Sequence, residues 1–142
     1  PDTHPRTLQK GLTMKVIHLN DLDGTDNDVE HGNWRSRRFV LAKDGVGFSF
    51  HDTHLKAGTT SDFWYANHIE CVYVYAGSGT LVNRDTDEKF ELKPGTMYLL
   101  DKHDKHTVIV DEDIHCACVF NPPVTGREVH DENGVYPLIT ED

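Results

Sequence analysis

Glu70, Tyr98 and His106 are the three residues of this chain whose types and positions best fit one chemical site, a metal centre. Glu70 stands in the alternating segment 69–76, where a period of two puts its carboxylate on the same face as Val72 and Val74. A carboxylate buried among β-branched residues is costly unless it is paired or bound to a metal, whereas on an exposed face it would be ordinary. The spacing of Glu70 alone leaves both interpretations open.

Tyr98 and His106 also have ordinary interpretations when each is taken alone. Tyr98 follows the Pro94-Gly95 turn by three residues and shares its face with Leu100, as a core tyrosine with its hydroxyl at a rim would. His106 opens the next apolar segment, where surface histidines are common, and the chain has 10 histidines. Together, however, the three residues fall on neighbouring predicted strands. Carboxylate, phenol and imidazole are hard or intermediate donors, which suit iron better than a soft metal.

The elements that must position these residues are short strands. Hydrophobic residues alternate almost everywhere, which predicts strands over 38–42, 47–55, 69–76, 80–83, 89–92, 97–101, 107–110 and 115–120. Gly77-Ser78-Gly79 is expected to turn the chain, residues 43–45 to break it, and 21–31 to form the one short helix. The prediction is an all-β, single-domain fold, a small β-barrel or jelly roll with a short N-terminal helix or extension.

Length and charge bound the function. A chain of 142 residues is one domain, and a net charge of −10 argues against nucleic acid or an anionic membrane as a partner. No apolar run approaches the roughly 20 residues of a membrane span. Residues 1–13 are expected to be a leader or non-native extension, because Met14 reads like a natural start, which leaves 14–142 as the domain.

Three cysteines, an odd number, do not make a disulfide framework. Cys116 and Cys118 are two apart and share a face of a predicted strand, which fits buried thiols and, as an alternative, a zinc-binding pair. A reducing cytoplasm is the expected location.

Two stretches resemble the motifs of the cupin fold. Glu70 is followed six residues later by Gly77, as in the second half of the first cupin motif, and Lys93-Pro94-Gly95 resembles the turn of the second, with Tyr98 where histidine is usual. Longer segments resemble the ectoine synthase family, and the resemblance runs from about residue 14 to residue 138. These segments are Gly32-Asn33-Trp34-Arg35-Ser36-Arg37-Arg38, Asn67-His68-Ile69-Glu70, and the runs 94–106 and 118–130.

The resemblance implies a cytoplasmic, usually homodimeric iron(II) enzyme that closes N-γ-acetyl-L-2,4-diaminobutyrate into ectoine with loss of water. It implies that Glu70, Tyr98 and His106 are the metal ligands and act in catalysis with Glu128 and His130. The implied substrate-binding residues are Trp34, Arg38, Thr53, Tyr65, Cys118, Phe120, Glu128 and His130. The chain departs from the family at Ala66, where lysine is frequent, and at Cys71, where alanine is common.

Two other functions compete with this one. A cupin dioxygenase or isomerase would also use iron, but such enzymes usually show three histidines or two histidines with a carboxylate. The histidine pair expected before Glu70 is absent, and Phe63, Trp64, Tyr65 and Ala66 fill that stretch. A non-catalytic, small-molecule-binding cupin would tolerate the loss of a ligand or of Glu128 and His130, all of which are present.

Overall fold

The computed structural model describes residues 14–65, 67–102 and 104–125, and almost all of its regular structure is β-strand. Two short 3-10 helices, η1 (Leu19–Leu22) and η2 (Ala42–Asp44), accompany the strands. The strands are β1 (Asp28–His31), β2 (Trp34–Val40), β3 (Ser49–Leu55), β4 (Thr60–Trp64), β5 (Ile69–Asn83), β6 (Lys89–Leu92), β7 (Met97–Leu100) and β8 (Lys105–Asn121). The predicted all-β fold is confirmed.

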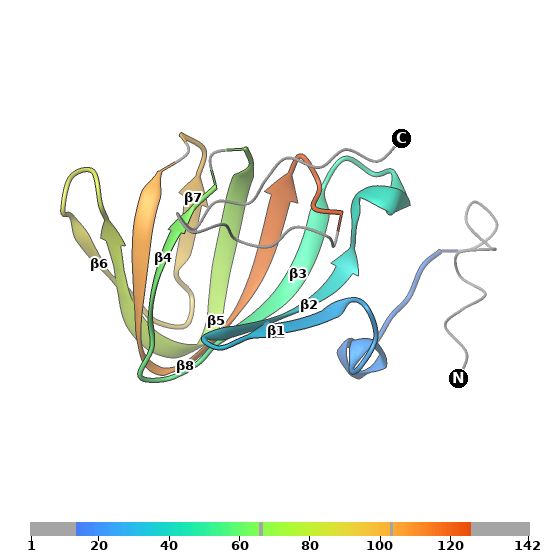
Figure 1. The fold of residues 1–142 in the computed structure, drawn as a ribbon, viewed down its shortest axis with the longest axis horizontal. Helices are drawn as coiled ribbons and strands as arrows, with labels where there is room; N and C mark the ends of the chain where they lie inside the picture. Colours follow the sequence, from blue (N-terminus) through green and yellow to red (C-terminus); the bar gives the residue numbers. More distant parts are fainter. Residues whose placement is uncertain (1–13, 66, 103, 126–142) are drawn as a thin grey trace.

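All eight strands join one antiparallel sheet in the order β1-β2-β3-β8-β5-β6, with β4 paired to β8 and β7 paired to β5. The long strands β5 and β8 pair with each other over most of their length. One half of β8 also pairs with β3, and the other half pairs with β4. Because these long strands bend, the sheet curls into a trough (Figure 1). β1–β3 and β7 lie with one half of the β5–β8 pair, and β4 and β6 lie with the other half.

The predicted turn at Gly77-Ser78-Gly79 is wrong, because these residues continue β5 as an irregular stretch in which the register with β8 shifts. Gly77 has a φ of +93°, and a Cβ there would lie 2.0 Å from the Asp113 backbone oxygen. At Gly79 a Cβ would lie 2.3 Å from the backbone oxygen of Ile109. These glycines therefore allow β8 to approach closely where the two strands bend, rather than reversing the chain.

Two other expectations also need correction. Residues 107–110 and 115–120 are parts of one strand, β8, since the acidic stretch 111–113 stays extended with its side chains exposed. Segment 21–31 is not a helix: η1 ends at Leu22, and Asp28–His31 pairs with β2 as an edge strand. The predicted break at 43–45 is confirmed, with Gly45 in the left-handed conformation after η2.

The core lies inside the trough, where every second residue of the long strands is buried. Val72, Val74, Val108, Ile114 and Leu92 are almost completely inaccessible to solvent. Among the described residues, none of the helical segments has the length and apolar character to cross a membrane.

Candidate active site

A cavity within the trough collects the predicted site residues from both of its sides. It is lined by Trp34, Ser36, His51, Thr53, Leu55, Phe63, Tyr65, Glu70, Val72, Tyr98, His106, Cys116, Cys118 and Phe120. Eight of the residues named from the sequence are in this set, and they come from β2, β3, β5, β7 and β8 and from the residue that follows β4. Strand alternation sends each of these side chains to the concave face.

Cross-strand pairing explains why residues far apart in sequence meet here. Arg38 lies opposite His51, His51 opposite Cys118, Cys118 opposite Val72, and Val72 opposite Tyr98. Opposite residues of an antiparallel pair project to the same side of the sheet, so this row crosses the trough from β2 to β7.

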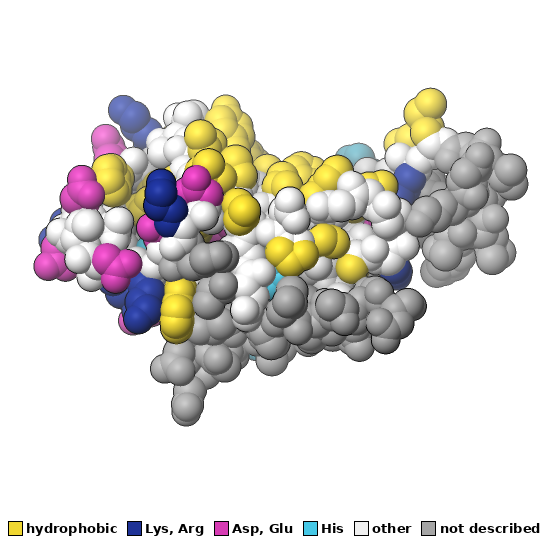
Figure 2. All heavy atoms as spheres, turned by 90° about the horizontal axis from the view of Figure 1, so that it is seen from above, with side chains coloured by type: hydrophobic (Ala, Val, Ile, Leu, Met, Phe, Trp, Pro, Cys, Tyr) yellow, Lys and Arg dark blue, Asp and Glu magenta, His cyan; other side chains and the backbone are white. Residues whose placement is uncertain are grey.

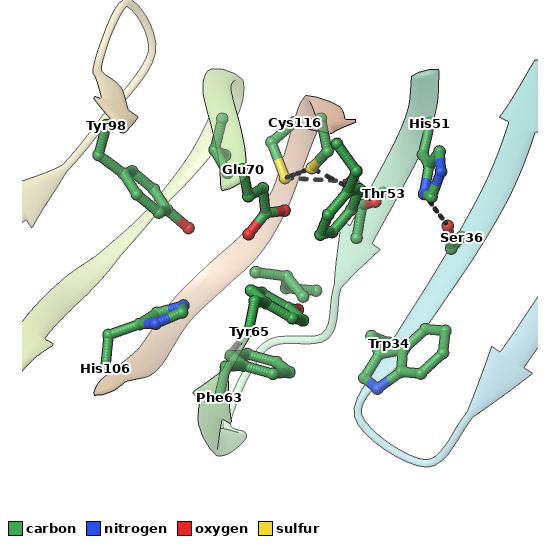
Figure 3. Close-up of a pocket in the computed structure, with 14 residues that line it drawn as sticks. Trp34, Ser36, His51, Thr53, Phe63, Tyr65, Glu70, Tyr98, His106 and Cys116 are labelled. Carbon is green, nitrogen blue, oxygen red and sulfur yellow. Dashed lines mark hydrogen bonds between the residues drawn. The ribbon is translucent and has the colours of Figure 1, made fainter. Parts of the chain in front are cut away.

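The three predicted metal ligands extend from three strands toward one space (Figure 3). Glu70 comes from β5, Tyr98 from β7 and His106 from the start of β8. The side chains of Glu70 and His106 are buried, at 5% and 2% exposure. The predicted sharing of a face by Glu70, Val72 and Val74 is confirmed by the burial of all three.

The hydrogen bonding of His106 leaves one ring nitrogen that could bind a metal. Its Nδ1 lies 3.2 Å from the carbonyl oxygen of Asp104, which can only accept a hydrogen bond. Nδ1 therefore carries the proton, and the lone pair of Nε2 is free for a metal, a common arrangement for ligating histidines. Burial lowers the pKa of His106 to about 4, so the ring is neutral near pH 7.

Burial disfavours the charged forms of Glu70 and Tyr98. Burial, with Cys118 adding to it, raises the pKa of Glu70 well above its usual range. Burial, followed by the charge of Glu70, does the same to the pKa of Tyr98. Among the described residues no ion pair includes Glu70. A bound metal cation would favour both anions, so this donor set fits a metal.

A metal at this place would need Tyr98 as one of its donors. Within the described part of the chain, no three His, Cys, Asp or Glu side chains are grouped so that they could hold a metal ion. Glu70 and His106 could supply two donors, and Tyr98, which lines the same cavity, could supply a third. The zinc alternative for the Cys116 and Cys118 pair finds no support there either.

Arg38 differs from the other predicted substrate-binding residues, because it is not among the residues that line the cavity. It is completely buried, and its Nε donates to Ser36 Oγ at 3.1 Å. Neither terminal nitrogen has a hydrogen-bond partner among the described residues. Glu128 and His130 lie outside the described residues, as does Ala66. Cys71 lies opposite Leu99 and Val119, on the face away from the cavity.

Sequence reasoning missed several lining residues, notably Ser36, His51, Phe63 and Cys116. The family resemblance implies a place in the pocket for Cys118 and not for Cys116, but both thiols line the cavity, 3.8 Å apart. Alternation could have found all four: Ser36 stands two residues from Trp34, His51 two from Thr53, Phe63 two from Tyr65, and Cys116 two from Cys118. The prediction of buried, unbridged thiols at both positions is confirmed.

Comparison with known proteins identifies the family. The ectoine synthase family model matches residues 14–140. L-ectoine synthases of Thermobifida fusca and Saccharopolyspora erythraea are 60% and 58% identical to this chain over 129 residues, which are 91% of this chain and 96% of each relative. The crystal structure of ectoine synthase from P. lautus superimposes with a TM-score of 0.81 at 46% identity, covering 91% of this chain and 93% of that one. The chain belongs to the ectoine synthase family.

Membership in the ectoine synthase family decides between the competing functions. At this identity over nearly the whole length, the protein is an enzyme of the carbon–oxygen lyase class with a cupin fold. The cupin dioxygenase, isomerase and non-catalytic alternatives are therefore set aside.

Aromatic rings wall the cavity of this ectoine synthase family member. Tyr65 packs edge-to-face on Phe120, with ring centroids 5.2 Å apart, and stacks on Phe63 at 6.0 Å. Phe63 also contacts the ring of His106. These rings make an apolar surface beside the polar donors, which limits access of bulk water to a molecule bound there.

Proposed function

We propose that this enzyme closes N-γ-acetyl-L-2,4-diaminobutyrate into the cyclic amidine ectoine with release of water. The observation that carries this proposal is the convergence of Glu70, Tyr98 and His106 on one aromatic-walled cavity in a member of the ectoine synthase family. The substrate's α-amine must attack its own acetyl carbonyl, a poor electrophile. Holding the two groups together can supply about 7–11 kcal/mol of the barrier.

We propose that the cofactor is iron(II), held by Glu70, Tyr98 and His106. The neutral imidazole with a free Nε2, and two buried acidic groups with no cation beside them among the described residues, support this. Bound iron would supply Lewis acidity that polarises the acetyl carbonyl. The protein would contribute three donors from three strands and would exclude bulk water from the metal site.

Arg38 is proposed to bind the substrate carboxylate. Its two terminal nitrogens match the two oxygens of a carboxylate, and neither has a partner among the described residues. This would fix the end of the substrate that carries the α-amine. Trp34, Thr53, Tyr65, Cys118 and Phe120 would line the remainder of the bound molecule.

The proton released by the α-amine is proposed to pass to Glu128 or His130, which the sequence resemblance assigns to catalysis. A truncation after Pro123 would remove Glu128 and His130 together, but it would also remove Val124. Val124 is fully buried, and its N–H donates to Ser49 Oγ at 2.9 Å. Single substitutions test the two residues without removing this buried contact. Glu128→Gln and His130→Gln should each lower kcat while leaving iron content unchanged, and normal turnover in both would eliminate these roles.

The direct test of the reaction is mass-spectrometric detection of ectoine from the acetylated diamine with iron-loaded protein. The product is lighter than the substrate by one water. Metal-free protein and Glu70→Ala protein are the matched controls. Failure of the iron-loaded wild type to form ectoine would contradict the proposed function.

We also propose a homodimer in the cytoplasm, with neither nucleic acid nor membrane as a partner. The outer face of β5 and β7 exposes apolar side chains at alternate positions, where Tyr73 lies opposite Met97 and Leu99 lies two residues farther along β7. Figure 2 shows hydrophobic side chains in a band along the upper border of the view, with charged side chains gathered at the end that carries β6. A second copy would bury this face. Sedimentation giving only a 16.1 kDa species at micromolar concentration would contradict the dimer.

A further inference from the structure

His51 is a buried cavity residue to which neither the fold nor the proposed reaction has yet given a role. It is 1% exposed, lines the cavity from β3, and packs its ring 5.1 Å from that of Phe120. Its Nδ1 lies 3.4 Å from Ser36 Oγ. Its Nε2 is buried and has no hydrogen-bond partner among the described residues. A buried polar atom left unpaired calls for a ligand.

Ser36 can set which nitrogen of His51 carries the proton. Arg38 lies directly opposite His51 across β2 and β3, and its Nε donates to Ser36 Oγ. A guanidinium nitrogen can only donate, so the serine oxygen accepts from Arg38, and its own hydrogen is available for Nδ1 of His51. When Nδ1 accepts that hydrogen, the proton of the neutral ring is on Nε2. The chain of bonds thus turns Nε2 into a donor.

The surroundings also keep His51 neutral. Burial lowers its pKa well below the usual value, and the charges of Arg38 and His68 lower the pKa further. Among the described residues, the titratable and charged groups that face the ring are Arg38 from β2, Cys118 from β8, and His68, which precedes β5. None of these three is a carboxylate that would stabilise a charged imidazolium. A neutral ring is a hydrogen-bond donor and a poor proton acceptor.

We propose that His51 is a substrate-binding residue, which donates a hydrogen bond from Nε2–H to the same carboxylate that Arg38 binds. This inference rests on the proposed function. Arg38 Nη1, Arg38 Nη2 and His51 Nε2 are three buried nitrogens without an acceptor among the described residues, carried by directly opposite residues of two strands. A carboxylate has two oxygens, each able to accept more than one hydrogen bond, so it can accept from all three of these nitrogens. Ser36 acts through His51 and is a positioning residue.

The test compares two substrates on three proteins. The wild type, His51→Leu and His51→Gln are each assayed with the acetylated diamine and with N-acetyl-1,3-diaminopropane, which lacks only the carboxylate. Leucine removes the donor, whereas glutamine keeps an N–H near the position of Nε2. A hydrogen bond to a buried charge corresponds to roughly a ten- to hundredfold change in affinity.

We expect His51→Leu to raise KM for the acetylated diamine roughly ten- to hundredfold, with kcat changed much less. The kinetic constants for the carboxylate-free analogue should stay unchanged. His51→Gln should recover most of the loss and keep the wild-type pH profile. An equal effect on both substrates would mean a structural role and overturn the proposal. Loss of the acid limb of the pH profile in His51→Gln would mean that His51 is a base, and would also overturn it.

Three controls keep the outcomes distinct. His54→Leu, on the outer face of the same strand, should behave as wild type, and thermal unfolding checks that each variant folds. Imidazole nitrogen NMR on the wild type should find His51 protonated at Nε2, and protonation at Nδ1 would contradict the assignment. If the wild type converts neither compound, the proposed function fails. If it converts the acetylated diamine and His51→Leu does so equally well, only the present inference fails.

Discussion

Arginine side chains on the two faces of β2 differ in whether their guanidinium groups are paired with carboxylates. On the outer face, Arg35 donates to both carboxylate oxygens of Asp28, at 2.8 and 2.9 Å, and also to Asp23. Arg37 pairs with Asp23 at 3.0 Å and with Asp52 at 3.7 Å. On the inner face, Arg38 is fully buried and only its Nε has a partner among the described residues, the hydroxyl of Ser36.

A paired arginine at the surface contributes to the stability of the fold, whereas a buried arginine with unpaired nitrogens can bind an anionic ligand. A bidentate arginine–carboxylate pair at the surface is satisfied without anything further. A buried guanidinium with unpaired ends carries a desolvation cost that an anionic ligand would offset. Neighbouring arginines of one strand, Arg37 and Arg38, therefore have different surroundings because alternation points them to opposite faces.

The largest effect is expected at the proposed metal ligands, which face the cavity. Glu70→Ala and Tyr98→Phe should each lower iron affinity by more than about a hundredfold, since losing even a residue that only orients a ligand costs 10- to 100-fold. Turnover should fall in parallel. Iron content by mass spectrometry and ectoine formation measure both. A Tyr98→Phe protein with full iron content would remove Tyr98 from the ligand set.

Arg38→Met should separate activity from stability on the inner face. We expect kcat/KM to fall by roughly a hundredfold or more, because a buried charge partner of the substrate is lost. The ligand-free protein should unfold at a temperature equal to or above that of the wild type, because an incompletely paired buried charge is gone. Calorimetry without ligand is the measurement. A large drop in melting temperature would show that Arg38 already has a strong partner in the folded protein.

Asp28→Asn should do the reverse on the outer face, with activity kept and stability reduced by about 1 kcal/mol. The hydrogen bonds of Arg35 lower the pKa of Asp28 from 3.8 to about 2. The folded state therefore binds this proton less readily than the unfolded state, so the contribution is complete above about pH 4. It is lost as the pH falls from 4 toward 2. Denaturant unfolding of both proteins should differ at pH 6 and converge near pH 2, and a constant difference would contradict this.

The smallest effect is expected where charge is fully solvated. Lys93 and Glu91 approach to 3.8 Å with side chains 67% and 75% exposed. Lys93→Ala should leave both the melting temperature and kcat/KM within experimental error, because such pairs contribute little. A measurable loss of activity would contradict this expectation and indicate that the end of β6 affects the active site.

Some errors of the sequence-based prediction have one physical cause. The sequence predicts a turn at Gly77 to Gly79 and a strand end before the acidic residues 111–113, because glycine-rich and charged stretches usually end strands. In the folded protein they continue two long strands at the point where both bend, and pairing between β5 and β8 outweighs local preference. Segment 28–31 was assigned to a helix because nothing local signals that an edge strand will pair with β2.

The fold class, the ectoine synthase family and the inward direction of Glu70 could be predicted from the sequence, since alternation and long motifs are local properties of the chain. The folded structure was needed to show that Ser36, His51 and Cys116 join the site and that Cys71 does not. It was also needed to show that Arg38 lies buried with two nitrogens unpaired among the described residues. Cross-strand register and burial are set by pairing between segments distant in sequence. For that reason they become visible only when the sheet is assembled.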